Sequence, residues 1–301
     1  MFTLRKLTLA IAITGLLSTP LLAATPSPQP VRILASLPIT YGLSELLLKD
    51  SGVTLERAAA ANLPGSRQSA YFSGRGAPAL QKLAENADAV VGLRSLWSDD
   101  PLYPMARRSN IRIVEVDAAR PVDGSLPGIA VQPDVHSDGL NSQPWLSSNN
   151  MGRMADVIAA DLVRLAPAAK PKIEANLAEL KQRLLKLSAE SESRLAKADN
   201  LSVVSVSDRL DYLISGLNLE RVDVAHNSED PWTPQALKAL TQTLKDNDVA
   251  LVLDHREPSP ELKAAITEGG SHLVVIGADG ADPVAQLQSN IDAIVAQMPS
   301  P

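Results

Sequence analysis

The sequence predicts an α/β protein of two lobes, each a mostly parallel sheet flanked by helices, joined by one long helix. Apolar segments of strand length alternate with amphipathic helical segments through residues 31 to 117, and the same alternation returns in residues 201 to 298. Between these stretches, residues 172 to 198 carry leucine and isoleucine at helical spacing. Strands that alternate with helices are typical of parallel sheets covered on both faces. The length of 301 residues also suits about two domains.

The first lobe is predicted to span residues 31 to 168. It begins with a buried strand at 31 to 38, which ends at Pro38, and a helix at 39 to 52, which stops at Gly52. The elements that follow are a strand at 53 to 61, a helix at 76 to 87, strands at 88 to 93 and 110 to 117, and a helix at 149 to 165.

Residues 118 to 144 are rich in proline, glycine, aspartate and serine and show no periodicity, which predicts a long loop. Loops of this length inside a compact domain are usually functional or mobile. His136 lies in this loop with Asp134 and Asp138 nearby. The segment is therefore either a metal-collecting loop or a solvated loop that happens to carry a histidine.

The connecting helix is predicted over residues 169 to 198 and the second lobe over 199 to 298. A helix at 172 to 198 would be about 40 Å long, roughly twice the usual length. A coiled coil would need more heptads, so a spine between the lobes explains it better. The second lobe is predicted to contain strands at 201 to 207, 220 to 226, 249 to 254 and 272 to 277, and helices at 208 to 218, 233 to 248, 259 to 270 and 282 to 298.

The N-terminal segment 1 to 24 has the pattern of a secretory signal peptide. Arg5 and Lys6 precede an apolar run at residues 7 to 17, and small residues follow at Ala23 and Ala24, where cleavage is expected. The chain has no cysteine, so it has neither a disulfide framework nor a site for a lipid at the junction. We expect a mature protein that is not a lipoprotein and does not insert into the membrane, in the periplasm between two bacterial membranes.

Composition and motifs exclude several classes of function. The net charge is −6 with no basic stretch, which argues against nucleic-acid binding. Aromatic residues make up only 3%, which argues against stacking platforms for bases or sugars. There is no Gly-x-Ser-x-Gly elbow, phosphate loop, cysteine nucleophile or His-Glu-x-x-His motif. We therefore expect that the protein is not an enzyme.

Four segments, in this order and spacing, carry a resemblance to a known family. They are PWLSSNNMGRMADVIAADL, VVSVSDRLDYLISGLNLE, NSEDPWTPQALKAL and LVLDHREPSPELKAAI. Together they resemble the metal-binding solute-binding proteins of ABC transporters, the zinc/manganese (cluster A-I) family, over nearly all of residues 31 to 298. The resemblance implies two α/β lobes, a rigid connecting helix, a metal held in the cleft between the lobes, and delivery to an ABC permease in the inner membrane.

The resemblance also implies four metal ligands, but most of their positions hold other residues here. Pro64 and Gly65 of the first ligand loop are kept, while its histidine is not. The four positions correspond to Tyr71 or Phe72, to Gln143, to Val206, Ser207 or Asp208, and to Asp279. Imidazole and carboxylate are the usual ligands of zinc, manganese and iron. The sequence therefore predicts a degenerate or rebuilt cleft site.

Other side chains could replace the missing ligands. Ligands bind at the carboxyl ends of parallel strands, which favours His226, Asp254 and His255 over His272, a residue that we expect to be structural. Asp279 and Asp282 flank Gly280 and form either an oxygen-ligand loop or a plain turn.

Aromatic and cationic residues indicate a different kind of ligand. Trp232 and Tyr71 are expected near the cleft. Arginines 67, 75, 209 and 256 lie in predicted loops or turns, where they are either simply solvated or part of a site. Aromatics with arginines suit a larger anionic ligand, such as a metal–siderophore complex, better than a bare cation.

Three interpretations follow, of which the first is preferred. The protein is a periplasmic solute-binding component of an ABC importer for metal uptake, iron or zinc, with a divalent ion in a rebuilt site. Alternatively it binds a chelated metal, as an iron–siderophore complex. In the third interpretation it is a non-transporting accessory protein that acts through contacts with a second periplasmic binding protein.

Overall fold

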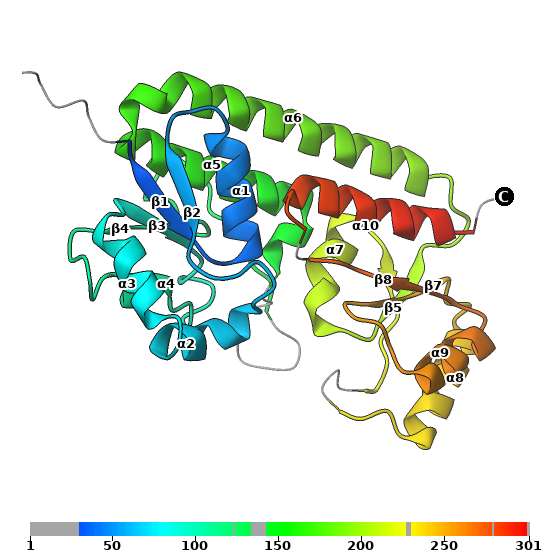
Figure 1. Ribbon diagram of the computed structural model, residues 1–301. Coiled ribbons are helices and arrows are strands. Elements are labelled where there is room, and N and C mark those ends of the chain that lie inside the picture. The colour runs from blue at the N-terminus through cyan, green and yellow to red at the C-terminus, as the bar shows by residue number, and fades with distance from the viewer. Residues whose placement is uncertain (1–29, 123, 134–142, 227–229, 279, 300–301) are drawn as a thin grey trace, which may run out of the picture.

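The computed structural model describes residues 30–122, 124–133, 143–226, 230–278 and 280–299 (Figure 1). Two lobes lie side by side beneath one long helix. Each lobe is built on a four-stranded sheet in which every pair of neighbouring strands is parallel. The predicted fold class is confirmed.

The N-terminal sheet has the strand order β2-β1-β3-β4. Its strands are β1 (Arg32–Ala35), β2 (Thr54–Arg57), β3 (Ala89–Gly92) and β4 (Val114–Asp117). Alternation along β1 divides the core, because Ile33 faces α1 (Pro38–Leu48) and α5 (Ser148–Leu165), whereas Leu34 faces the opposite layer. That layer consists of α2 (Gly65–Ser73), α3 (Ala77–Glu85) and α4 (Leu102–Ala106). Both faces of the sheet are therefore covered.

Residues 63 to 78, expected to form a loop, contain α2 instead. The helix has a weak apolar pattern of its own, and tertiary contacts stabilise it. Phe72 is buried in the core, and the buried amide of Gln68 donates to the carbonyl of Ser36 at 3.1 Å. Hydrophobic periodicity in the sequence could not predict this helix, because only two of its side chains, Gln68 and Phe72, are buried.

The C-terminal sheet repeats the plan with the order β6-β5-β7-β8. Its strands are β5 (Ser202–Ser205), β6 (Glu220–Arg221), β7 (Leu251–Asp254) and β8 (His272–Val275). The helices are α7 (Asp211–Gly216), α8 (Pro234–Asp246), α9 (Pro260–Glu268) and α10 (Pro283–Gln297). Strand β6 is shorter than the predicted segment 220 to 226, since it lies at the exposed edge of the sheet.

Helix α6 (Lys170–Leu195) is the spine of the molecule (Figure 1). It packs against α1 and α5 of the N-terminal lobe and against α10 of the C-terminal lobe. One apolar cluster runs from Ile33 through Leu180 to Ile291, so the two lobes share a continuous core along this helix. In the described part of the chain, no helix is long and apolar enough to span a membrane.

Candidate functional site

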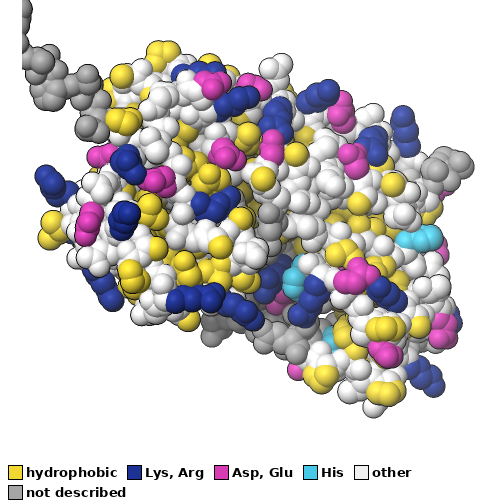
Figure 2. Space-filling view, in the orientation of Figure 1, with side chains coloured by type: hydrophobic (Ala, Val, Ile, Leu, Met, Phe, Trp, Pro, Cys, Tyr) yellow, Lys and Arg dark blue, Asp and Glu magenta, His cyan; other side chains and the backbone are white. Residues whose placement is uncertain are grey.

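A cavity of about 530 Å³ lies between the lobes. The N-terminal lobe contributes the loops that follow β1 and β3, including Leu37 and Trp97, together with Gln143 and Trp145. The C-terminal lobe contributes Arg209 and other loop residues that follow β5, β7 and β8. These are the carboxyl ends of parallel strands, where α/β sheets bind ligands. Figure 2 shows cationic and histidine side chains gathered where the two lobes meet.

The floor of this cleft is aromatic. Trp145 lies on the 3₁₀ turn Pro144–Leu146, directly after Gln143, and only 5% of its surface is exposed. Its ring meets that of Trp97 edge to face, with centroids 5.6 Å apart. Both indole N–H groups are buried and have no hydrogen-bond acceptor among the described residues. Both rings therefore line the cleft, while their N–H groups are shielded from solvent.

Asp100 is an acidic residue of the cleft whose carboxylate is already engaged. Its Oδ2 accepts from the backbone N–H of Leu93 at 2.8 Å, and its Oδ1 accepts from that of Leu102 at 3.1 Å. Burial raises the pKa of this carboxyl, while the two N–H donors act in the opposite direction. Asp100 therefore holds the loop after β3 in place instead of offering free oxygens to a ligand.

His255 lines the cleft, but Asp254 does not. The Asp254 carboxylate is buried and accepts from the backbone N–H groups of His255 and Arg256 at 2.7 and 3.3 Å. The Nδ1 of His255 lies 3.3 Å from the same Oδ1, without the alignment of a hydrogen bond. Asp254 thus fixes the backbone of the turn after β7.

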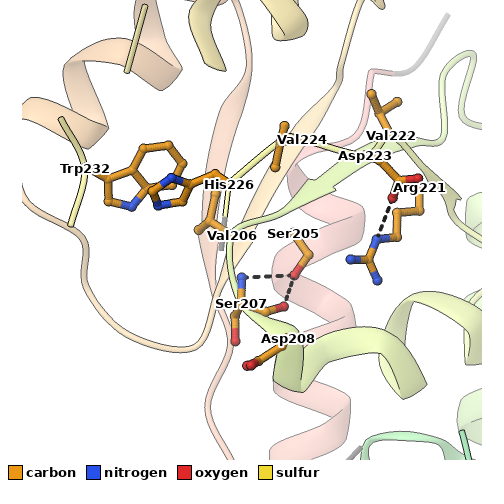
Figure 3. A pocket seen from close by; sticks show the side chains of 10 residues that line it. All are labelled: Ser205, Val206, Ser207, Asp208, Arg221, Val222, Asp223, Val224, His226 and Trp232. Atoms are coloured by element: carbon orange, nitrogen blue, oxygen red, sulfur yellow. Dashed lines mark hydrogen bonds and ion pairs between the residues drawn. The ribbon is translucent and has the colours of Figure 1, made fainter. Parts of the chain in front are cut away.

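A second groove, of about 430 Å³, lies within the C-terminal lobe at the ends of β5 and β6 (Figure 3). Its walls include Asp208, His226 and Trp232. The His226 imidazole stacks on the Trp232 indole, with centroids 3.6 Å apart and planes at 25°. His226, Trp232 and Asp208 therefore belong to this groove and not to the cleft that contains His255 and Gln143.

The remaining predicted site residues lie elsewhere. Tyr71, expected near the cleft, packs on α2 against Phe72 and Gly76, because the segment is helical and not a loop. Asp282 caps α10 and pairs with Arg183. Asp279 and His136 lie outside the described residues.

The described residues provide no preformed metal centre. Among them, no three histidine, cysteine, aspartate or glutamate side chains lie close enough together to hold a metal ion. The cleft side chains Gln143, Arg209 and the two indoles are poor ligands for zinc. In the described lining, His255 contributes one imidazole and Asp99 contributes an exposed carboxylate.

Comparison with known proteins decides the family. The family model described as "ZnuA: Zinc-uptake complex component A periplasmic" matches residues 78–297. This chain belongs to the ZnuA family. No curated protein sequence matches it.

Solved structures show the same fold as this ZnuA-family chain. A crystal structure of ZnuA has a TM-score of 0.70 and 21% identity, covering 89% of this chain and 99% of that one. FpvC from Pseudomonas aeruginosa, in complex with Ni²⁺, has a TM-score of 0.68 and 22% identity, covering 90% and 97%. Zn(II)-bound AdcA from Streptococcus pneumoniae has a TM-score of 0.67 and 18% identity, covering 91% of this chain and 59% of that one.

Trp97 and Asp100 line the cleft of this ZnuA-family protein but were not predicted as site residues from the sequence. The signal was present, because the segment LWSDDP follows the strand that ends at Gly92. The rule of strand carboxyl ends, applied to the first lobe as it was to the second, would have selected it.

Proposed function

We propose that this ZnuA-family protein is the periplasmic solute-binding component of an ABC importer for metal uptake, with the solute held between the lobes. The observation that carries the proposal is the cavity of about 530 Å³ lined by strand-end loops of both lobes. A solute there touches both lobes at once, so its binding stabilises one relative orientation of the lobes. An inner-membrane permease that contacts both lobes would recognise that orientation.

Further support comes from the family and from the sequence. The family is described as a periplasmic component of zinc uptake. FpvC is described in complex with Ni²⁺ and AdcA as Zn(II)-bound. The predicted signal peptide at residues 1 to 24 supports export of the mature chain to the periplasm. In the free-ion form of this function, His255 and Gln143 hold a divalent ion in a rebuilt site.

The test is to purify the mature protein gently from the periplasm of metal-replete cells and to record its native mass and metal content together. One equivalent of metal at the mass of protein plus ion supports the free-ion form, and His255→Ala should then abolish it. His226→Ala, in the other groove, is the matched control and should retain the metal.

A second form of the function is favoured by the aromatic floor and by Arg209, which suit a metal complex better than a bare ion. Extra mass of an organic molecule in the native spectrum would support it. A bare protein that no ion or complex stabilises against heat contradicts both forms, since a solute that binds the native state must raise its midpoint. That result would favour the accessory-protein interpretation.

A further inference from the structure

We propose that residues 128 to 133 act as a strap that ties the N-terminal lobe to α7 of the C-terminal lobe and thereby limits the width of the cleft. The strap is part of the long connection between β4 and α5. Hydrogen bonds fasten it at both ends, and both attachment points lie next to walls of the cleft. The inference concerns how the lobes are held together and does not depend on the identity of the solute.

The first attachment point is the start of α5, in the N-terminal lobe. The Asn150 amide donates to the carbonyl of Ala130 at 2.9 Å, and its Oδ1 accepts from the backbone N–H of Ala130 at 2.8 Å. Arg153 donates to the carbonyl of Gly128 at 3.0 Å, and Ile129 packs against the core. Asn150 is itself buried, so its hydrogen bonds are stronger than they would be in water. The first part of the strap is therefore fixed to α5.

The second attachment point is α7, in the C-terminal lobe. The backbone N–H of Gln132 donates to the Tyr212 hydroxyl at 2.7 Å, and the Gln132 side-chain amide donates to the Ser215 hydroxyl at 2.7 Å. These bonds join residues 80 and 83 positions apart in the chain, so they are not part of a local turn. The Tyr212 ring is buried in the core, which fixes the position of its hydroxyl. Within two residues of Ala130, the chain has crossed from one lobe to the other.

The strap reinforces a direct contact between the same two elements. Gly216, at the end of α7, lies so close to Ser147 that a Cβ on Gly216 would come within 3.6 Å of the Ser147 Cα. Helix α7 also packs against the turn Pro144–Leu146. The close approach of Gly42 to α10 is a separate contact between the lobes. Two junctions, built from different elements, therefore oppose rotation of the lobes about α6.

Both attachment points continue into walls of the cleft. Helix α7 begins directly after the turn Asp208–Leu210, whose Arg209 lines the cleft. On the other side, Gln143 and Trp145 line the cleft directly before α5. A movement of α7 away from α5 separates these two walls. Such a movement requires that the bonds of the strap break.

Two substitutions release the strap from α7 and leave its attachment to α5 intact. Tyr212→Phe keeps the buried ring and removes the acceptor of the Gln132 N–H. Gln132→Ala removes the bond to Ser215, and this position is only partly buried, so folding is preserved. Loss of one hydrogen bond shifts an equilibrium by up to about tenfold. We therefore expect Tyr212→Phe to make opening of the junction up to about tenfold more frequent, and the double variant to increase it further.

The test measures both the distance between the lobes and the opening of the junction. The chain has no cysteine, so Lys82→Cys on α3 and Lys238→Cys on α8, both exposed, accept spin labels at one position in each lobe. Double electron–electron resonance should show a broader distribution of distances when the strap is released. Hydrogen exchange of the Ser147 N–H, which donates to the carbonyl of Pro144, should become up to about tenfold faster in Tyr212→Phe.

Tyr103→Phe is the matched control. It removes a tyrosine hydroxyl that accepts from Arg107 within the N-terminal lobe, and it should change neither measurement. Unchanged distances and exchange in the double variant Tyr212→Phe, Gln132→Ala would overturn the inference, and so would equal changes in Tyr103→Phe. Either result leaves the proposed function intact, because that function is tested by the solute found in the protein purified from the periplasm.

Discussion

The indole of Trp97, which follows β3, meets that of Trp145 edge to face, with centroids 5.6 Å apart and planes at 71°. Such a pair contributes about 0.5–1.5 kcal/mol beyond the area that it buries. The pair ties the loop after β3 to the 3₁₀ turn before α5. The cleft floor is therefore part of the core of the N-terminal lobe.

Trp145→Ala should lower the free energy of unfolding by about 3–5 kcal/mol, because it removes a buried ring and leaves a cavity. Urea denaturation checks this value. Leu185→Ala is the control, since Leu185 is 71% exposed on α6, and it should change stability by at most about 0.5 kcal/mol. A small effect of Trp145→Ala would mean that the floor of the cleft is not rigidly packed.

Gly42 is a point of close approach between the lobes. A Cβ at this position on α1 would lie 2.8 Å from the carbonyl oxygen of Ala281 and 2.8 Å from Pro283. Gly42→Ala should therefore lower the free energy of unfolding by about 1–3 kcal/mol, or move α10 away from α1. Thermal unfolding and small-angle scattering measure the two outcomes.

Gly152→Ala is the matched control for that variant. Gly152 also lies within a helix, α5, but its Cβ would make only an ordinary contact at 3.6 Å with Leu184. This change should raise stability by about 0.5–1 kcal/mol, because alanine favours a helix interior. Equal effects of the two substitutions would contradict the close approach at Gly42.

Asp282 has two roles that substitutions can separate. Its carboxylate accepts from the backbone N–H groups of Val284 and Ala285 at the start of α10, and it pairs with Arg183 of α6 at 2.7 Å. Asp282→Ala should cost about 1 kcal/mol through loss of the cap. Asp282→Asn keeps the cap and should cost less, because a solvent-exposed ion pair contributes little. Urea denaturation of both variants measures the two losses of stability. Equal losses would show that the ion pair with Arg183 contributes more than the cap.

The raised pKa of Asp100 predicts that the stability of the protein depends on pH. Its folded pKa is raised above the ordinary value of 3.8 by burial. Between these two pKa values the native state binds more protons than the unfolded state, so this carboxyl's contribution to stability falls as pH rises. The stability of the wild type minus that of Asp100→Asn should therefore fall as pH rises through the range above 3.8. Urea denaturation across this range measures the difference, and a rise would mean that the two backbone donors outweigh burial.

The sequence alone predicted the scaffold well because its signals are local. Thr233 and Pro234 mark the start of α8, and the continuous apolar run at residues 33 to 35 of β1 marks a strand covered on both faces. The site was predicted less well, because being near the end of a strand does not say which cavity a side chain enters. His226 and His255 both follow strands of the same sheet, yet they line different cavities.

What the sequence by itself determined is therefore the two α/β lobes and the long helix between them. Only the tertiary structure decided that Trp97 and Trp145 meet, that Gln68 and Phe72 stabilise a helix at α2, and that His255 shares a cleft with Gln143 and Arg209. The physical reason is that hydrophobic periodicity reports which face of an element is buried. The composition of a cleft between lobes depends on how the lobes are oriented, and contacts of α6, α10 and Gly42, distant from one another in the chain, set that orientation.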